Sequence, residues 1–161
     1  MPDKAKKGKN MTTTDKKPVN SMKCTFPVRS INEGLSRMVV AAFVSQLDPT
    51  VSELSDMKTV VSEAVTNCIV HAYKGVADKS KVYVYITGEY YKDGRVVIRI
   101  KDKGLGIDDV KQARQPLFTT DGESERSGMG FTIMESFTDK LRVYSKKGRG
   151  TTVVLEKRIG L

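Results

Sequence analysis

Apolar positions recur along this chain with a helical period that is clearest between residues 50 and 73. They are spaced three and four residues apart, so they share one side of a helix. Thr50 and Glu53 form a capping-box pattern that predicts the start of this helix, and Gly75 predicts its end near Tyr73. The apolar positions are Leu54, Met57, Val61, Ala64, Val65, Cys68 and Ala72.

Three polar residues follow a different side of the same helix. Glu63 and Asn67 are four residues apart and therefore lie one above the other, and His71 extends their stripe by another turn. An ordinary solvated helix face would carry the same residue types. Two glycine-rich turns downstream, at 102–106 and 127–130, favour a functional site instead.

The segment before this helix predicts a strand at 22–27 and a further helix at 32–47. That helix ends before Pro49, because proline disfavours the helical conformation in the residue that precedes it. Arg37 falls on its polar side. Its expected apolar side comprises Leu35, Val39, Ala42, Phe43 and Leu47.

The second half of the chain changes to a strand-like pattern of β-branched and aromatic residues. Taken together, the elements predict an α/β protein of the α+β type, a two-layer sandwich whose mostly antiparallel sheet is covered on one face by helices. The expected elements are strands at 81–86 and 95–100 around a turn at 92–94, a short helix at 107–114, an irregular stretch at 115–126, a helix at 131–137, and strands at 141–145 and 151–157.

Composition changes this picture mainly at the amino terminus. The chain has 161 residues and a net charge of +9, of which residues 1–20 carry +4 and the remainder +5. Residues 1–20 are too polar to bury much surface and predict a disordered tail or an added extension, followed by a single domain at 21–161. No cluster of Lys and Arg interleaved with aromatic residues is visible, so we expect no direct contact with nucleic acid.

The location of the protein follows from its cysteines and its apolar runs. Cys24 and Cys68 are the only cysteines and show no metal-ligand spacing, which favours the reducing cytoplasm. The longest apolar run, 38–44, is far too short to cross a bilayer, and no hydrophobic signal segment follows the first lysines. We therefore expect a cytoplasmic protein without membrane contact.

The glycine-rich turns suggest a ligand with phosphate groups. Gly104, Gly106, Gly128 and Gly130 let backbone approach a ligand where a Cβ would clash. The segment 127–130 opens a helix, whose free amides favour an anion. The sequence contains neither a P-loop nor the protein-kinase motif set.

The order of these motifs is more specific than any one of them. It runs E-x-x-x-N on a helix, D-x-G-x-G after a strand, G-x-G at a helix start, and a Gly-Thr-Thr strand. This order resembles the Bergerat-type fold of gyrase-type, chaperone-type and sensor-kinase ATPases. More closely, residues from about 24 to 158 resemble the anti-sigma-F factor of endospore-forming bacteria, a serine-protein kinase, with near-identical segments at 60–67, 115–120 and 125–135.

The resemblance implies a site for ATP or ADP with Mg²⁺. Asn67 would bind the metal, Asp102 would accept the adenine amino hydrogen, and Glu63 would act as the catalytic base. Arg126 would stabilise charge at the transferred phosphate or form a salt bridge in a lid at about 115–127. The other implied nucleotide contacts are Gly104, Gly106, Thr119, Thr120, Ser127, Gly128, Met129, Gly130 and either Thr151 or Thr152.

The resemblance also implies partners. The protein would inhibit a sporulation sigma factor, and it would phosphorylate and inactivate an anti-anti-sigma protein. Arg37 and Glu125 match positions that contact these partners, and the family forms homodimers. The chain departs from the family at Asp121-Gly122, within the expected lid.

Three alternatives remain open at this stage. One is a nucleotide-binding anti-sigma module without significant kinase turnover, which the presence of Glu63 disfavours. Another is a general-stress anti-sigma kinase of the same family. A sensor histidine kinase would require a phospho-accepting histidine on a dimerisation hairpin, whereas His71 is the only histidine and lies in the predicted site helix.

Overall fold

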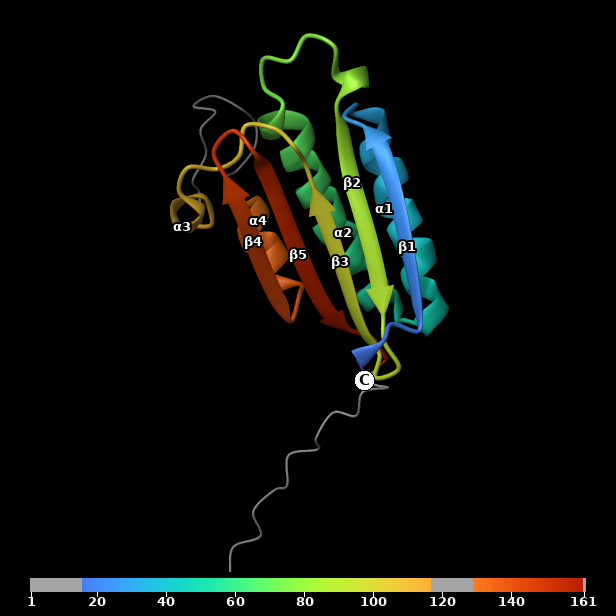
Figure 1. Ribbon diagram of the computed structural model, residues 1–161. Coiled ribbons are helices and arrows are strands. Elements are labelled where there is room, and N and C mark those ends of the chain that lie inside the picture. The colour runs from blue at the N-terminus through green and yellow to red at the C-terminus, as the bar shows by residue number, and fades with distance from the viewer. Residues whose placement is uncertain (1–15, 117–128, 161) are drawn as a thin grey trace, which may run out of the picture.

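A computed structural model describes residues 16–116 and 129–160 of the chain. Figure 1 shows a five-stranded sheet with α1, α2 and α4 packed on one face, which confirms the predicted two-layer α+β sandwich. The elements are β1 (Asn20–Pro27), α1 (Ile31–Val44), η2 (Ser45–Leu47), α2 (Val51–Asn67), the π-helical segment η3 (Cys68–Ala72), η4 (Lys79–Lys81), β2 (Tyr83–Tyr90), β3 (Arg95–Lys101), α3 (Val110–Ala113), α4 (Gly130–Ser136), β4 (Lys140–Lys146) and β5 (Gly150–Arg158).

The strands are arranged in the order β1-β2-β3-β5-β4, and every neighbouring pair is antiparallel. The closing hairpin places β5 directly beside β3, although more than 45 residues separate their paired positions Ile100 and Val153. Because side chains alternate across a strand, one set of rows packs on the helices and the other faces away from them. Ile86, Ile98 and Leu155 are fully or almost fully buried under the helices.

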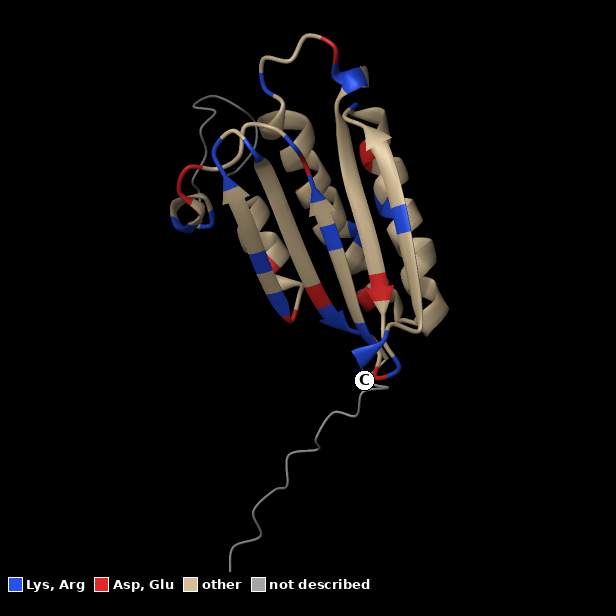
Figure 2. Cartoon of the chain, viewed as in Figure 1, with Lys and Arg blue, Asp and Glu red and all other residues tan. Residues whose placement is uncertain are grey.

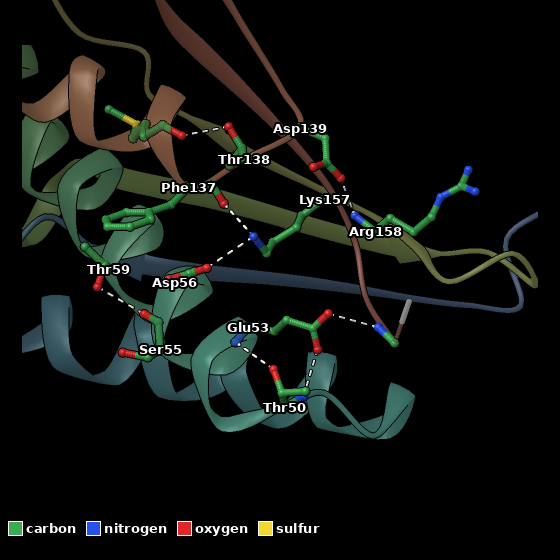
Figure 3. A network of polar contacts seen from close by, with 12 residues as sticks. Thr50, Glu53, Ser55, Asp56, Thr59, Phe137, Thr138, Asp139, Lys157 and Arg158 are labelled. Atoms are coloured by element: carbon green, nitrogen blue, oxygen red, sulfur yellow. Dashed lines mark hydrogen bonds and ion pairs between the residues drawn. The ribbon is translucent and has the colours of Figure 1, made fainter.

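Helix α2 begins at the predicted capping box. The Thr50 side chain accepts a hydrogen bond from the Glu53 amide at 3.1 Å, and the Thr50 amide donates to the Glu53 carboxylate at 2.8 Å. The second carboxylate oxygen of Glu53 accepts from the Gly160 amide at 3.1 Å (Figure 3). These bonds, first of all that from Thr50, hold the pKa of Glu53 below its ordinary value.

A second link ties the same end of α2 to the sheet and to α4. The Lys157 ammonium lies 3.2 Å from the Asp56 carboxylate and donates to the Phe137 carbonyl at 2.9 Å (Figure 3). The Arg158 amide donates to Asp139 at 2.7 Å. The start of α2 is therefore anchored at the far end of β5, which sets the position of the whole helix.

The predicted apolar side of α2 lies in the core, with Met57, Val61, Ala64, Val65 and Cys68 all buried. The predicted end of the helix near Tyr73 is wrong in detail. The α-helix stops at Asn67, and a π-helical segment continues it to Ala72. Such wider turns shift the phase of side chains locally and are frequent at functional sites.

The predicted apolar side of α1 is also partly wrong. Leu35 is 48% exposed and Ala42 is exposed, whereas Ser36 and Val40 are buried against the sheet and α2. A buried serine is tolerated because its hydroxyl donates to the Asn32 carbonyl at 2.6 Å within the helix. This local bond removes the cost that sequence patterning assigns to a polar residue in the core.

Two further boundaries differ from the predictions. The helix expected at 107–114 is only α3, because the Asp109 side chain caps it by accepting from the Gln112 amide at 3.0 Å. Strand β2 begins later than expected, after the short helix η4. At the amino terminus, β1 begins at Asn20, one residue before the predicted start of the domain. No helix in the described part of the chain has the length and apolar character needed to span a membrane.

Candidate active site

One large cavity of about 1280 Å³ lies between α2 with η3, the loop after β3 and the start of α4. Its size exceeds that of a typical small-molecule site. Residues predicted from distant parts of the sequence meet in its wall. These are Arg37, Glu63, Asn67, Asp102, Gly106, Met129, Gly130 and Thr151, and His71 also lines the cavity.

The start of α4 lies directly against the polar stripe of α2. A Cβ built on Gly130 would lie 3.2 Å from Oε2 of Glu63 and 3.6 Å from both polar side-chain atoms of Asn67. Glycine at this position therefore lets the backbone of α4 approach the carboxylate and the carboxamide. The cavity brings together an acid, an amide and the first turn of a helix.

Asp102 directly follows β3 and is only 4% exposed. Its Oδ1 accepts hydrogen bonds from the amides of Gly104 at 3.0 Å and Thr151 at 3.2 Å. Its Oδ2 lies 3.7 Å from the Cys68 thiol, which donates to it. Burial raises the pKa of Asp102 above its ordinary value, and the backbone donors oppose that rise.

Cys68 is buried in the core beside this carboxylate. Burial raises the pKa of its thiol well above the ordinary value, and the neighbouring charge of Asp102 adds to the effect. The thiol therefore remains protonated and serves as a donor. Sequence analysis placed Cys68 on the apolar side of the helix and missed this contact, since nothing local links positions 34 residues apart.

The loop from Asp102 to Ile107 is held at several points. The Lys103 amide donates to the Tyr73 hydroxyl at 2.7 Å, and that hydroxyl donates to the Tyr83 carbonyl at 2.9 Å. The Leu105 amide donates to the Ala72 carbonyl at 2.8 Å. A loop fixed by this many bonds presents its cavity-facing atoms in one geometry, which favours selective binding.

The hydroxyl of Ser145 is a second positioning group that sequence reasoning missed. It accepts from the Ile107 amide at 2.8 Å and lies 2.7 Å from the Thr151 hydroxyl. Of the two threonines considered from sequence, Thr151 lines the large cavity and Thr152 does not. Thr151 is therefore the residue whose hydroxyl lies at the back of this site.

The two glycines of the loop have different surroundings. Gly104 does not line the cavity; a Cβ there would lie 2.0 Å from the Ala72 carbonyl oxygen, so the glycine permits packing of the loop on η3. Gly106 lines the cavity, has a φ of +74°, and a Cβ there would lie 2.2 Å from the Lys146 carbonyl oxygen. Backbone approach to neighbouring backbone explains both positions.

A matched pair of substitutions separates this steric effect from backbone strain. Gly148 has the same φ of +74° as Gly106, but a Cβ there would meet nothing within 4 Å. We expect Gly148→Ala to lower the free energy of unfolding by about 1 kcal/mol, from the conformation alone. Gly106→Ala should lower it by a further 1–3 kcal/mol or so, because the added methyl forces the two backbones apart. Urea denaturation measures both, and equal losses would contradict the close packing of this loop.

Arg37 lies at the edge of the cavity. Its guanidinium is 3.1 Å from the Glu33 carboxylate, one helical turn earlier, and 3.5 Å from the Ser62 hydroxyl on α2. Its side chain is 45% exposed, so it can reach both the cavity and an approaching protein.

Six predicted site residues lie outside the described part of the chain, as does the Asp121-Gly122 departure. They are Thr119, Thr120, Glu125, Arg126, Ser127 and Gly128. Within the described residues, no group of three or more His, Cys, Asp or Glu side chains could hold a metal ion.

The fold and the cavity define a nucleotide-binding domain of the ATPase class, and comparison with known proteins agrees. Residues 26–157 match the family described as histidine kinase-like ATPase domain. The RsbU and RsbW domains of Rv1364c from Mycobacterium tuberculosis share the fold, with a TM-score of 0.62, 18% identity, and coverage of 88% of this chain and 33% of that one. A chain of the SiaB-SiaC complex from Pseudomonas aeruginosa has a TM-score of 0.60 at 11% identity, covering 84% of this chain and 88% of that chain.

Sequence relatives narrow the assignment. An anti-sigma F factor of Clostridium perfringens (strain SM101 / Type A) is 49% identical over 140 residues, which is 87% of this chain and 97% of the relative. That of Priestia megaterium is 51% identical over 140 residues, which is 87% of this chain and 93% of the relative. This chain belongs to the anti-sigma F factor family, as its motifs indicated.

Proposed function

We propose that this chain is an ATP- and Mg²⁺-dependent serine kinase that also binds a sporulation sigma factor. The observation that carries the proposal is the single cavity that Glu63, Asn67 and Asp102 all line. The name shared by the relatives, anti-sigma F factor, supports the sigma-factor part. The kinase substrate in this proposal is a serine of the anti-anti-sigma partner, which is inactivated by phosphorylation.

The adenine end of the site would be built around Asp102. A carboxylate accepts hydrogen bonds, so it suits the exocyclic amino group of adenine and disfavours guanine, which carries a carbonyl oxygen at that position. The two backbone donors on Oδ1 leave Oδ2, now bonded only by the Cys68 thiol, as the oxygen with spare accepting capacity. ATP would therefore be preferred to GTP.

The residues present fit a Mg²⁺ ion held together with the nucleotide. Mg²⁺ prefers oxygen ligands and usually takes one or two from protein, with waters and substrate phosphates completing the set. The Asn67 carboxamide supplies one such oxygen in the cavity wall. The bound ion would neutralise phosphate charge.

Glu63 would act on the attacking group. In the transfer, a bond forms between the partner serine Oγ and the γ-phosphorus, the bond from that phosphorus to the β,γ-bridging oxygen breaks, and ADP leaves with the electron pair. The serine proton passes to the Glu63 carboxylate. Glu63 lies one helical turn from Asn67 and next to the start of α4, so its carboxylate borders the space that the nucleotide phosphates would occupy.

The remaining nucleotide contacts would come from the glycine-rich helix start and the lid. Met129 and Gly130 line the cavity, and we propose that their backbone holds phosphate together with Ser127 and Gly128. Thr119, Thr120 and Arg126 would contribute from a lid that excludes water from the transfer.

Binding of the two partner proteins would be mutually exclusive. Arg37 at the cavity edge and Glu125 are the proposed contacts, so nucleotide state and partner choice would be coupled through one surface. We further propose a cytoplasmic homodimer, as the family resemblance implies.

Replacing Asn67 tests the metal role. We expect Asn67→Ala to remove most of the Mg²⁺-dependent part of ATP affinity, about tenfold, while affinity in the presence of EDTA stays unchanged. Isothermal titration with and without Mg²⁺ measures this. Gln112→Ala, which removes another carboxamide from the same cavity wall, is the matched control and should leave the Mg²⁺ dependence intact. Unchanged Mg²⁺ dependence in Asn67→Ala would exclude this residue as a ligand.

The function as a whole is tested by single-turnover transfer. The full chain, labelled ATP and Mg²⁺ are mixed with the anti-anti-sigma protein of the same host, and label on a partner serine supports the kinase. Nucleotide binding without transfer would instead identify a module that sequesters the sigma factor. Absence of nucleotide binding would overturn the entire proposal.

A further inference from the structure

The face of the sheet that points away from the helices is the second prominent surface of this molecule. In Figure 1 it faces the reader, with α1, α2 and α4 behind it. We infer that this face binds single-stranded nucleic acid. The proposal is independent of the proposed kinase function, because the large cavity lies on the helical side of the sheet.

The register of the strands builds a row of polar and aromatic side chains across this face. Lys101 lies opposite Tyr85 on one side and Thr152 on the other, and Thr152 lies opposite Tyr144. The neighbouring residues Ile86, Ile100 and Val153 form the parallel row that packs in the core. Since successive side chains alternate, the row with Lys101 points outward.

A shallow hollow lies at the end of this face near the turn between β4 and β5. Its volume is about 310 Å³, and its wall includes Lys101, Tyr144, Lys146, Arg149 and Thr152. Tyr144 is 60% exposed, an unusual state for an aromatic ring that has a sheet to pack on. The hollow thus combines cations with an accessible ring.

The charges at this end are not neutralised within the described part of the chain. Lys101, Lys103, Lys146 and Arg149 form no ion pair with any described residue. Lys103 instead lies 4.8 Å above the ring of Tyr85. Asp102, which borders the hollow, has its carboxylate buried and bonded inside the loop.

The opposite end of the same face behaves differently. Its two acidic residues are paired, Glu89 with Arg99 at 2.9 Å and Glu156 with Arg142 at 3.1 Å. Figure 2 shows these red segments on the lower parts of β2 and β5, whereas the upper ends of β3 and β4 are blue. The unpaired positive charge is therefore concentrated around the hollow.

Single-stranded nucleic acid fits this combination. Cations along a groove contact phosphates, and exposed aromatic rings stack on bases, as in RNA-binding sheets that present aromatics on an open face. An acidic protein would use the charges but has no bases to stack on Tyr144. The sequence showed no such cluster, because its members come from β3, β4 and the turn between β4 and β5.

The test uses fluorescence anisotropy with a labelled single-stranded oligonucleotide, the full chain and excess ADP to fill the nucleotide site. We expect the triple variant Lys101→Ala, Lys146→Ala and Arg149→Ala to weaken binding at least tenfold. It should also reduce the slope of log affinity against log salt by about 2, from ~0.7 per lost phosphate contact. The control is Lys17→Ala, Lys58→Ala and Lys92→Ala, which removes equal charge away from the hollow and should have a much smaller effect.

A second pair of variants examines the ring. Tyr144→Ala should weaken single-strand binding about tenfold through lost stacking, and Tyr144→Phe should retain binding. ADP affinity should be unchanged in every variant, which separates this proposal from the kinase site. Equal losses in both triple variants would overturn it, as would normal binding by Tyr144→Ala together with equal competition by polyglutamate, which would identify a surface for acidic protein.

Discussion

Glu63→Gln is expected to slow phosphate transfer to the partner serine by about 100-fold or more, while ATP affinity stays close to that of the parent. The amide is nearly the same size as the carboxylate, so the cavity wall keeps its shape, but the amide cannot take the serine proton. General-base catalysis contributes about 10²–10⁴-fold, which sets the expected size. Rapid-quench single turnover with saturating ATP measures transfer separately from binding.

Glu33→Gln is the matched control for this experiment. Glu33 also lines the cavity, but its carboxylate is paired with Arg37 at 3.1 Å on α1. Its replacement should leave the transfer rate within about threefold, because it removes no proton acceptor from the α2 stripe. A loss below threefold in Glu63→Gln would show that Glu63 is not the base.

Asp102→Asn is expected to lower ATP affinity by about 100-fold. At the proposed adenine position, an amide group would present donor hydrogens to the donor hydrogens of the base, and a site built for a hydrogen bond rejects a mismatched group strongly. Oδ1 of the new side chain still accepts from the Gly104 and Thr151 amides, so the loop should keep its structure. Titration with ATP measures the loss, and Asp108→Asn, in an exposed acid of the same cavity, is the control.

The same variant has a predictable effect on stability. Burial raises the pKa of Asp102 in the folded protein, so between the unfolded and folded pKa values the folded state binds more protons than the unfolded state. The contribution of Asp102 to the free energy of unfolding is therefore greatest below its unfolded pKa and falls as pH rises through the folded pKa. Asn cannot titrate, so Asp102→Asn should become more stable relative to the parent as pH rises through this window.

Thermal or urea unfolding at several pH values checks this sign. A stability difference that is independent of pH would contradict a raised pKa at Asp102. Normal ATP affinity in a stable Asp102→Asn protein would remove the residue from base recognition, whatever the pH result.

Local sequence was sufficient for the parts of the site that lie on one element. The four-residue spacing of Glu63 and Asn67 places them on one side of α2 by helix geometry alone, and the capping box at Thr50 and Glu53 sets where that helix begins. The antiparallel sheet and its helical cover also followed from the change of period along the chain. These features depend on interactions between residues close in sequence.

Other features depended on tertiary packing. Sequence periodicity placed Leu35 in the core, but the packing of α1 buries Ser36 instead, since a hydrogen bond to its own helix satisfies the hydroxyl. It also could not anticipate the π-helical segment after Asn67. Both outcomes reflect how neighbouring layers fit, which no local pattern records.

The surroundings of Asp102 show the same division. Its position after a strand and before glycine was visible in the sequence, but its partners Cys68 and Thr151 lie 34 and 49 residues away. They meet it only because β5 inserts beside β3 and α2 packs beneath them. The outward row with Lys101 and Tyr144 arises from the same strand order. Residue spacing fixes geometry within an element through covalent bonds, whereas contacts between elements are set by which apolar faces must be buried together.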